Sequence, residues 1–191
     1  MATCCTADAA VASGAVAQLD EVMARGYLDG LEEWPIERVR GRRDDATEVE
    51  TGLSYLRRIV QGRLDIVLSE QQRRRLGQPS GDLDELVERL PEILGDRVHA
   101  PGLGRLPVLL APGELDDRFA ARLDEVLPSA KLDALQDFDD AGLRSACDAL
   151  EELERDVSSQ RRSVFDVIDR LQEELVRRYR SGEASVDSLL S

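Results

Sequence analysis

The side chains best suited to bind a ligand occur as two series of nearly identical composition and spacing. The members are Glu50, Ser54, Arg57, Gln61 and Asp65 in the first series, and Glu154, Ser158, Arg161, Phe165 and Asp169 in the second. Carboxylates accept hydrogen bonds, hydroxyls both donate and accept, and arginine donates a planar fork to phosphate oxygens or to guanine. The residue types therefore predict recognition of a polar, anionic ligand.

Helices are needed to bring the members of each series together. Successive helical residues turn by about 100°, so this spacing places five side chains within a sector of roughly 80°. An apolar register accompanies each series at the same offset of 104 residues: Leu53, Val60, Leu64 and Val67 recur as Val157, Val164, Ile168 and Leu171. We expect two amphipathic helices, each with a polar stripe beside an apolar seam. Antiparallel pairing would relate the stripes by a local two-fold axis, which suits a two-fold symmetric ligand.

Simpler interpretations of the stripes remain open. Glu, Ser, Arg and Asp are ordinary residues on the solvated face of a coiled coil, so one stripe alone indicates only a hydrated surface. The joint repeat of polar types and apolar register favours a shared role. An old duplication or chance would also produce it.

The chain as a whole predicts a helical protein. Its 191 residues are 42% hydrophobic but only 4% aromatic, which is typical of helices packed through aliphatic seams. The predicted fold is all-α: an antiparallel coiled-coil hairpin of two long helices, residues 44–77 and 139–181, within a single domain spanning 1–191. Residues 1–12 are expected to be disordered and residues 80–137 to form short helices and loops. Short helices are expected at Ser13–Ala24, Asp82–Leu94 and Glu114–Leu127.

The charge balance favours a basic protein partner. Lys and Arg number 25 against 39 Asp and Glu, and the net charge of -14 opposes direct binding to DNA, RNA or an anionic membrane. No apolar run approaches the length of a membrane span, and the amino terminus lacks the positive flank of a secretory signal. Cys4, Cys5 and Cys147 have neither metal-site nor CxxC spacing. We expect a soluble cytoplasmic protein that does not contact the membrane.

Catalytic and metal sites are not predicted. His99, the only histidine, lies beside Pro101 without a nucleophile or a second histidine at useful spacing, so we interpret it as a surface residue. The run Arg73-Arg74-Arg75 is interpreted as a cationic match to a helix dipole. The protein is predicted not to be an enzyme and to bind no metal.

The first series, Glu50-x3-Ser54-x2-Arg57-x3-Gln61-x3-Asp65, resembles the signature of RsiG-type anti-sigma factors from spore-forming actinobacteria. The second long helix repeats the signature with one departure, Phe165 in place of glutamine. The resemblance implies that two antiparallel helices together hold cyclic di-GMP. It also implies that the loaded protein sequesters WhiG, a flagellar-type sigma factor that controls sporulation. The resemblance covers both long helices and leaves residues 80–137 and the amino terminus without a matching motif.

The chemistry of cyclic di-GMP fits the roles that this resemblance implies. The dinucleotide presents two guanines and two phosphates with two-fold symmetry, and arginine can fork onto either group or stack on a base. Acidic stripe residues can accept the guanine N–H groups, and Ser or Gln can bind phosphate or ribose oxygens. Phe165 removes one polar contact and either stacks on a base or fills a groove. The expected ligand-binding residues are Glu50, Ser54, Arg57, Gln61, Asp65, Glu154, Ser158, Arg161 and Asp169.

Two rival functions belong to other classes of protein. A ligand-independent coiled-coil adaptor would bind its partner through helical faces and leave the stripes solvated. An enzyme acting on the dinucleotide would need carboxylates or histidines grouped around a metal and a scissile phosphate. The acidic residues of this sequence are spread along helix faces, which disfavours the enzyme.

Overall fold

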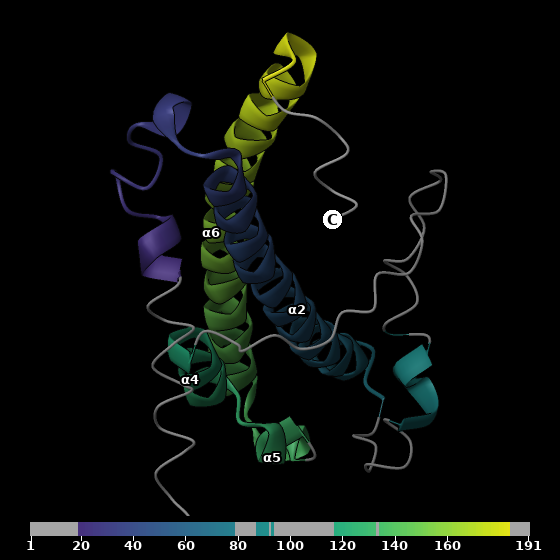
Figure 1. Cartoon of the computed structure of the whole chain (residues 1–191). Coiled ribbons are helices and arrows are strands. Elements are labelled where there is room, and N and C mark those ends of the chain that lie inside the picture. Colours follow the sequence, from purple (N-terminus) through teal and green to yellow (C-terminus); the bar gives the residue numbers. More distant parts are fainter. Residues whose placement is uncertain (1–18, 79–86, 92, 94–116, 133, 184–191) are drawn as a thin grey trace, which may run out of the picture. The chain divides into compact units, whose positions relative to one another are not determined.

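All regular structure in the described part of the chain is helical. The computed structural model describes residues 19–78, 87–91, 93, 117–132 and 134–183. Its elements are η1 (Leu31–Glu33), α2 (Ile36–Arg75), α4 (Asp117–Val126), α5 (Ser129–Leu132), η2 (Leu135–Asp137) and α6 (Asp140–Ser181), where η marks a 3-10 helix. Figure 1 shows α2 and α6 as the two long helices. The all-α prediction is confirmed.

The first long helix, α2, begins at Ile36, and its predicted start at residue 44 is wrong. Pro35 favours a start here because its fixed φ suits a first turn. The Pro35 carbonyl accepts hydrogen bonds from the amides of Arg38 at 3.0 Å and Val39 at 3.2 Å. Val39 is fully buried, so packing carries the helix across Gly41 despite the weak helix propensity of glycine.

The second long helix matches its predicted range of 139–181 almost residue for residue. The short segments agree less closely. Residues 19–22 are helical, two residues short of the predicted end at Ala24, and 87–91 are helical within the predicted Asp82–Leu94 segment. The helix α4 lies within the predicted Glu114–Leu127 segment. The predicted disorder of residues 1–12 lies outside the described residues, and the single domain stays a prediction.

The described residues form two compact units, and each unit contains part of α2 and part of α6. The first unit includes residues 19–54 and 158–183, and the second includes 55–78, 118–132 and 134–157. Side-chain contacts link the two helices at Arg40–Tyr179 and Glu50–Arg161 in the first unit, and at Arg57–Glu154 and Arg74–Asp140 in the second. Within each unit, the α6 number falls as the α2 number rises. The two helices therefore run antiparallel, as predicted.

The apolar register forms the seam between α2 and α6 in each unit. Leu53, Val60, Leu64 and Val67 are buried, as are Val157, Val164 and Leu171. Ile168 is only half-buried. Because this seam fixes which way each helix faces, the polar stripe beside it is positioned by burial of the apolar side chains.

A buried arginine near the end of α6 holds the turn that precedes α2 in the first unit. Arg178 donates hydrogen bonds to the main-chain carbonyls of Leu31, at 2.8 Å, and Trp34. Glu174, also buried, accepts from Nε of Arg178 at 2.5 Å and from Arg177 at 2.8 Å. Hydrogen bonds from Arg177, and then from Arg178, hold the pKa of the Glu174 carboxyl at about 2, below its ordinary value of 4.5. We call Glu174 and Arg178 the first clasp.

The second unit contains the same clasp, displaced by the offset that relates the two stripes. Arg74 donates to the carbonyls of Leu135 at 3.0 Å and Phe138 at 2.7 Å, and its Nε donates to Glu70 at 2.9 Å. Each of these residues lies 104 positions from its counterpart in the first unit, and so do the starts of α2 and α6. We call Glu70 and Arg74 the second clasp. The repeat therefore covers a 3-10 turn, a long helix and a clasp.

Candidate functional site

In the first unit, three stripe residues form a hydrogen-bonded cluster between α2 and α6. Arg161 donates through Nε to Oε1 of Glu50 at 2.7 Å and to Oγ of Ser54 at 2.6 Å. The Ser54 hydroxyl donates to the same Glu50 oxygen at 2.6 Å. The Glu50 and Arg161 side chains are 15% and 29% exposed, so a ligand can still reach them. We call Glu50, Ser54 and Arg161 the first cluster.

Phe165 takes part in this arrangement without a hydrogen bond. The guanidinium carbon of Arg161 lies 4.7 Å from the centre of the Phe165 ring, within the range of a cation–π contact. Arg161 makes its polar contacts in the described structure through Nε alone, so its two terminal amino groups remain able to donate to a ligand. Phe165 therefore supports the arginine whose fork is available, and the sequence left this role open.

In the second unit, a matching cluster joins the other arginine to the other glutamate. Arg57 donates through Nε to Oε1 of Glu154 at 2.9 Å, and Gln61 donates through Nε2 to the same oxygen at 3.0 Å. The Arg57 and Glu154 side chains are 38% and 21% exposed. We call Arg57, Gln61 and Glu154 the second cluster.

The two clusters are related by the repeat through an exchange of partners. The arginine of the first series binds the glutamate of the second series, and the arginine of the second series binds the glutamate of the first. Gln61 and Phe165 occupy equivalent positions, one hydrogen bonding to the glutamate and the other stacking on the arginine. Each cluster thus contains its own Arg–Glu pair. The clusters differ at the fourth position of the series, which is Gln61 in the first series and Phe165 in the second.

The remaining three predicted residues also lie on the two long helices. Ser158 and Asp65 are half-buried, and each of them has at least one interaction partner. Asp169 is exposed on α6, one turn beyond Phe165. The hydrogen bonds described above join six of the nine predicted site residues, three in each unit.

The clasps are the positioning residues that sequence reasoning missed. We interpreted Arg73-Arg74-Arg75 as a match to the helix dipole, but Arg74 also binds the carbonyls of the turn before α6. The signal that could have revealed both clasps is Glu70-x2-Arg73-Arg74, which recurs as Glu174-x2-Arg177-Arg178. It lies at the same offset as the stripes.

Cysteine and metal chemistry do not contribute to the described clusters. Cys147 is free and buried, and burial raises the pKa of its thiol, which disfavours the reactive thiolate. Among the described residues, no three His, Cys, Asp or Glu side chains are grouped so as to hold a metal ion. None of the described helices is both long enough and apolar enough to cross a membrane.

The antiparallel helices and their repeated Arg–Glu clusters define an all-α protein with an internal sequence repeat. The chain belongs to the RsiG-like family, whose model matches residues 25–94 and 129–191, more than half of the sequence. The two matched segments begin 104 residues apart, which equals the offset of the repeat. None of the curated proteins matches the sequence. Membership identifies the protein as an RsiG-type anti-sigma factor, and this family is regulatory.

Proposed function

We propose that this anti-sigma factor binds cyclic di-GMP through the first and second clusters and sequesters a flagellar-type sigma factor when it is loaded. The observation that carries the proposal is the exchange of partners between the repeats, because it gives both units an arginine oriented by a carboxylate. Both clusters contain an Arg–Glu pair, so each can recognise the same chemical group, and cyclic di-GMP carries two identical guanines. The sequence resemblance to RsiG-type proteins supplies the identity of the nucleotide.

Each cluster offers guanine a donor and an acceptor. The terminal amino groups of Arg161 can donate to O6 and N7 of the base, and Glu50 can accept from N1–H and the exocyclic amine. Arg57 and Glu154 offer the same chemistry in the second unit. Ser158, Asp65 and Asp169 are proposed to contribute further polar contacts to ribose or phosphate. Binding would redirect each glutamate from its arginine toward the base, so the existing ion pairs are a resting arrangement.

The proposed partner is a sigma factor of the WhiG type, which links the nucleotide to the control of sporulation in an actinobacterial host. Sigma factors act on RNA polymerase, so this role places the protein in the cytoplasm. The acidic chain, with a net charge of -14, complements basic sigma-factor surfaces that otherwise contact DNA.

The experiment is an equilibrium titration of fluorescent cyclic di-GMP into wild type and the Arg57→Ala and Arg161→Ala variants. We expect each variant to bind at least about tenfold more weakly, because a charge-assisted fork to a base edge is lost. Arg122→Ala and Arg42→Ala are matched controls, since these arginines form ion pairs outside the stripes with similar exposure. Undiminished binding in both stripe variants would remove the site assignment. Absence of binding by wild type would leave the clusters as ion pairs of a ligand-independent adaptor.

A further inference from the structure

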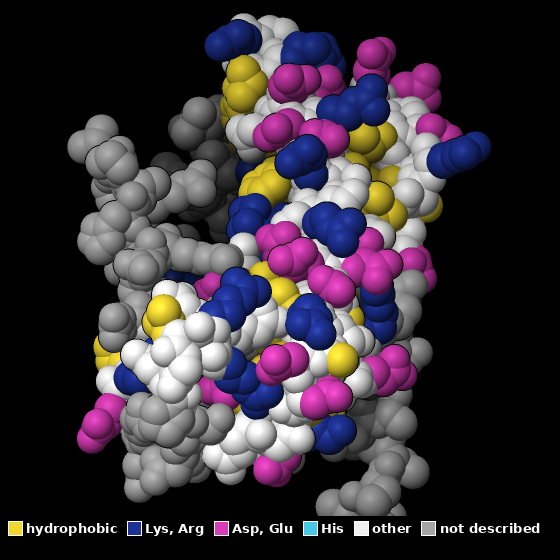
Figure 2. Space-filling model, turned by 180° about the vertical axis from the view of Figure 1, so that it is seen from behind, with side chains coloured by type: hydrophobic (Ala, Val, Ile, Leu, Met, Phe, Trp, Pro, Cys, Tyr) yellow, Lys and Arg dark blue, Asp and Glu magenta, His cyan; other side chains and the backbone are white. Residues whose placement is uncertain are grey.

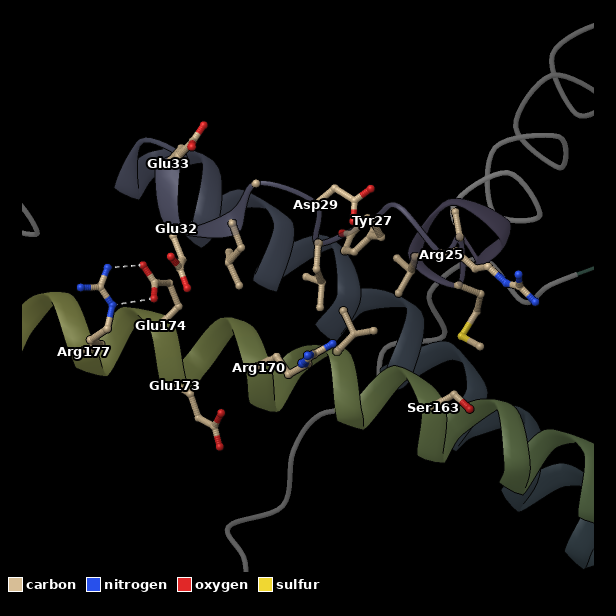
Figure 3. A pocket seen from close by; sticks show the side chains of 17 residues that line it. Arg25, Tyr27, Asp29, Glu32, Glu33, Ser163, Arg170, Glu173, Glu174 and Arg177 are labelled. Atoms are coloured by element: carbon tan, nitrogen blue, oxygen red, sulfur yellow. Dashed lines mark hydrogen bonds and ion pairs between the residues drawn. The ribbon is translucent and has the colours of Figure 1, made fainter.

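The first unit contains an open cavity that neither cluster uses. It has a volume of about 820 Å³ and lies between residues 22–33 and the outer face of α6, from Ser163 to Arg177. Figure 3 shows Tyr27 and Asp29 on the chain opposite α6, Arg170 rising from that helix, and Arg25 and Arg177 toward opposite ends. The apolar residues lining it include Val22, Met23, Leu28, Leu31 and Val167.

The repeat shows that the equivalent position in the second unit is filled. Arg63, the counterpart of Val167, has a side chain only 11% exposed and donates to the carbonyls of Leu123, at 3.2 Å, and Leu127. Leu127, the counterpart of Met23, is completely buried, whereas Met23 is 37% exposed. Because Val167 stands where the second unit has Arg63, apolar surface remains exposed in the first unit. In the second unit, Arg63 and the buried Leu127 fill the equivalent position at the end of α4.

The rim of the cavity is acidic. Asp29, Glu32, Glu33 and Glu173 line it and form no ion pair with the residues that the structure describes, whereas Arg177 is paired with Glu174. Arg25 and Arg170 are the only unpaired cations among its described lining residues. On the face drawn in Figure 2, by contrast, basic and acidic side chains are interleaved. An apolar floor with surplus carboxylates suits an amphipathic helix flanked by Lys or Arg.

We infer that this cavity is the docking groove for a cation-flanked amphipathic helix of the sigma factor. The inference rests on the proposed function, because it takes the occupant from the partner proposed there. The groove lies in one of the two described units, so it holds one partner helix although the nucleotide clusters are repeated. Met23 and Val167 contact the apolar face of the helix, and Glu32, Glu33 and Glu173 face its cations.

The test fills the groove with the residue found at the equivalent closed position. Val167→Arg is expected to weaken binding of the purified flagellar-type sigma factor of the same host at least about tenfold, measured by titration with saturating cyclic di-GMP. Met23→Lys is expected to act in the same direction by placing a cation on the floor. Leu68→Lys is the matched control, because Leu68 is also 37% exposed but lies in the second unit. Circular dichroism and cyclic di-GMP titration verify that each variant is folded and loaded.

Retained sigma-factor affinity in folded Val167→Arg and Met23→Lys would overturn the groove and leave the proposed function intact. Failure of wild type to bind the sigma factor would overturn both, so the two failures are distinguishable. Two other outcomes would also overturn the inference by assigning a different occupant. One is a change in the oligomeric state of the isolated protein caused by Val167→Arg, which would indicate a second copy. The other concerns a protein that lacks residues 1–18. If this protein binds the sigma factor as wild type does, and if Val167→Arg no longer weakens that binding, the occupant of the groove would be the chain's own amino terminus.

Discussion

Each stripe arginine is held by a glutamate from the opposite helix, and this contact both orients the guanidinium and competes with a ligand. Arg161 is fixed through Nε by Glu50 and Ser54, which reduces the rotamer freedom that binding would otherwise cost. Arg57 is fixed in the same way by Glu154. In each cluster the arginine N–H groups are therefore already oriented before a ligand binds. The glutamate carboxylate must give up its hydrogen bond to the arginine in order to accept one from the base.

Replacement of Phe165 tests how far the ring supports Arg161. Phe165→Ala should weaken cyclic di-GMP binding severalfold, because a cation–π contact at a partly exposed site is worth about 0.5–1 kcal/mol. Phe165→Gln should recover part of the loss, since glutamine can donate to Glu50 as Gln61 donates to Glu154. Isothermal titration calorimetry measures both effects.

Phe138→Ala is the control for this substitution, because the Phe138 ring also lies near a cation, Lys131, but outside the clusters. Equal affinities for wild type and Phe165→Ala would show that the ring only fills space beside α6.

The residues of the stripes could be predicted from the sequence, but their pairing could not. Residue type, helical spacing and the repeat single out Arg57 and Arg161 as donors. Which carboxylate each arginine meets depends on the register of α2 against α6, a long-range property set by packing of the apolar seam. The support of Arg161 by Phe165 has the same origin, since it depends on side-chain rotamers fixed by neighbours.

At the scale of elements, the clasps connect the end of one long helix to the turn that begins the other. Arg178 donates hydrogen bonds to the carbonyls of Leu31 in η1 and of Trp34, the residue after η1. Arg74 donates in the same way to Leu135 in η2 and to Phe138, the residue after η2. The carbonyls of Leu31 and Leu135 each also accept a main-chain hydrogen bond from the residue three positions later. The arginine fork adds charge-assisted hydrogen bonds and thereby stabilises the turn. The clasps thereby fix where α2 and α6 begin, and with that the positions of the stripes.

Loss of the first clasp should destabilise the protein strongly. Arg178→Ala leaves the buried Glu174 with fewer partners and removes the hydrogen bonds to the carbonyls of Leu31 and Trp34. Removal of one member of a buried pair typically costs about 3 kcal/mol. Urea unfolding followed by circular dichroism gives the free energy of unfolding. Arg122→Ala, which removes a half-exposed pair with Asp156, should change it by less than about 1 kcal/mol. Similar values for the two variants would contradict the clasp.

The pKa of Glu174 predicts an acid dependence of stability. The carboxyl has a pKa of about 2 in the folded protein against an ordinary 4.5, so the unfolded chain takes up the proton first as the pH falls. The stabilisation by Glu174 is then complete above pH 4.5 and is lost as the pH falls from 4.5 toward 2. Thermal melts of wild type should show this loss in that range.

Glu174→Gln should be less stable than wild type at pH 7 and should lose less stability between pH 4.5 and 2. Glu152→Gln, which alters an exposed glutamate of the same helix, serves as the control. A wild-type pH profile reproduced by Glu174→Gln would show that other groups cause the acid loss.

The long helices themselves were predictable because burial follows the helical period over many turns, whereas local details were not. The sequence pattern predicts the start of α2 eight residues too late, since the burial of Val39 depends on tertiary contacts that outweigh the weak helix propensity of Gly41. The 3-10 turns are three residues long and have no periodic signal. Their only signal in the sequence is the recurrence of Glu70-x2-Arg73-Arg74 as Glu174-x2-Arg177-Arg178, because Arg74 and Arg178 bind the carbonyls of these turns.

For the whole molecule, the proposal links two binding events in one chain. If cyclic di-GMP favours the form that binds the sigma factor, the sigma factor must raise the affinity for cyclic di-GMP by the same factor. A typical coupling of about 1–3 kcal/mol corresponds to roughly a 5- to 150-fold change.

Titrations of the sigma factor with and without the nucleotide should therefore differ by a factor in this range, and the reciprocal titrations should give the same factor. Cyclic di-AMP is the matched control, because it has the same backbone but lacks the guanine edge. Equal sigma-factor affinities in the presence and absence of cyclic di-GMP would show that the protein acts independently of the nucleotide.

The central claim is that the Arg–Glu pairs serve a ligand and do not merely join two helices. The most direct measurement is cyclic di-GMP affinity in the double variant Arg57→Glu/Glu154→Arg, which exchanges the two members of one pair across α2 and α6. The ion pair can re-form in the exchanged orientation, so the free energy of unfolding should stay close to that of wild type. The account predicts a loss of nucleotide affinity of at least about tenfold in this folded variant. Wild-type affinity in the exchanged variant would contradict it.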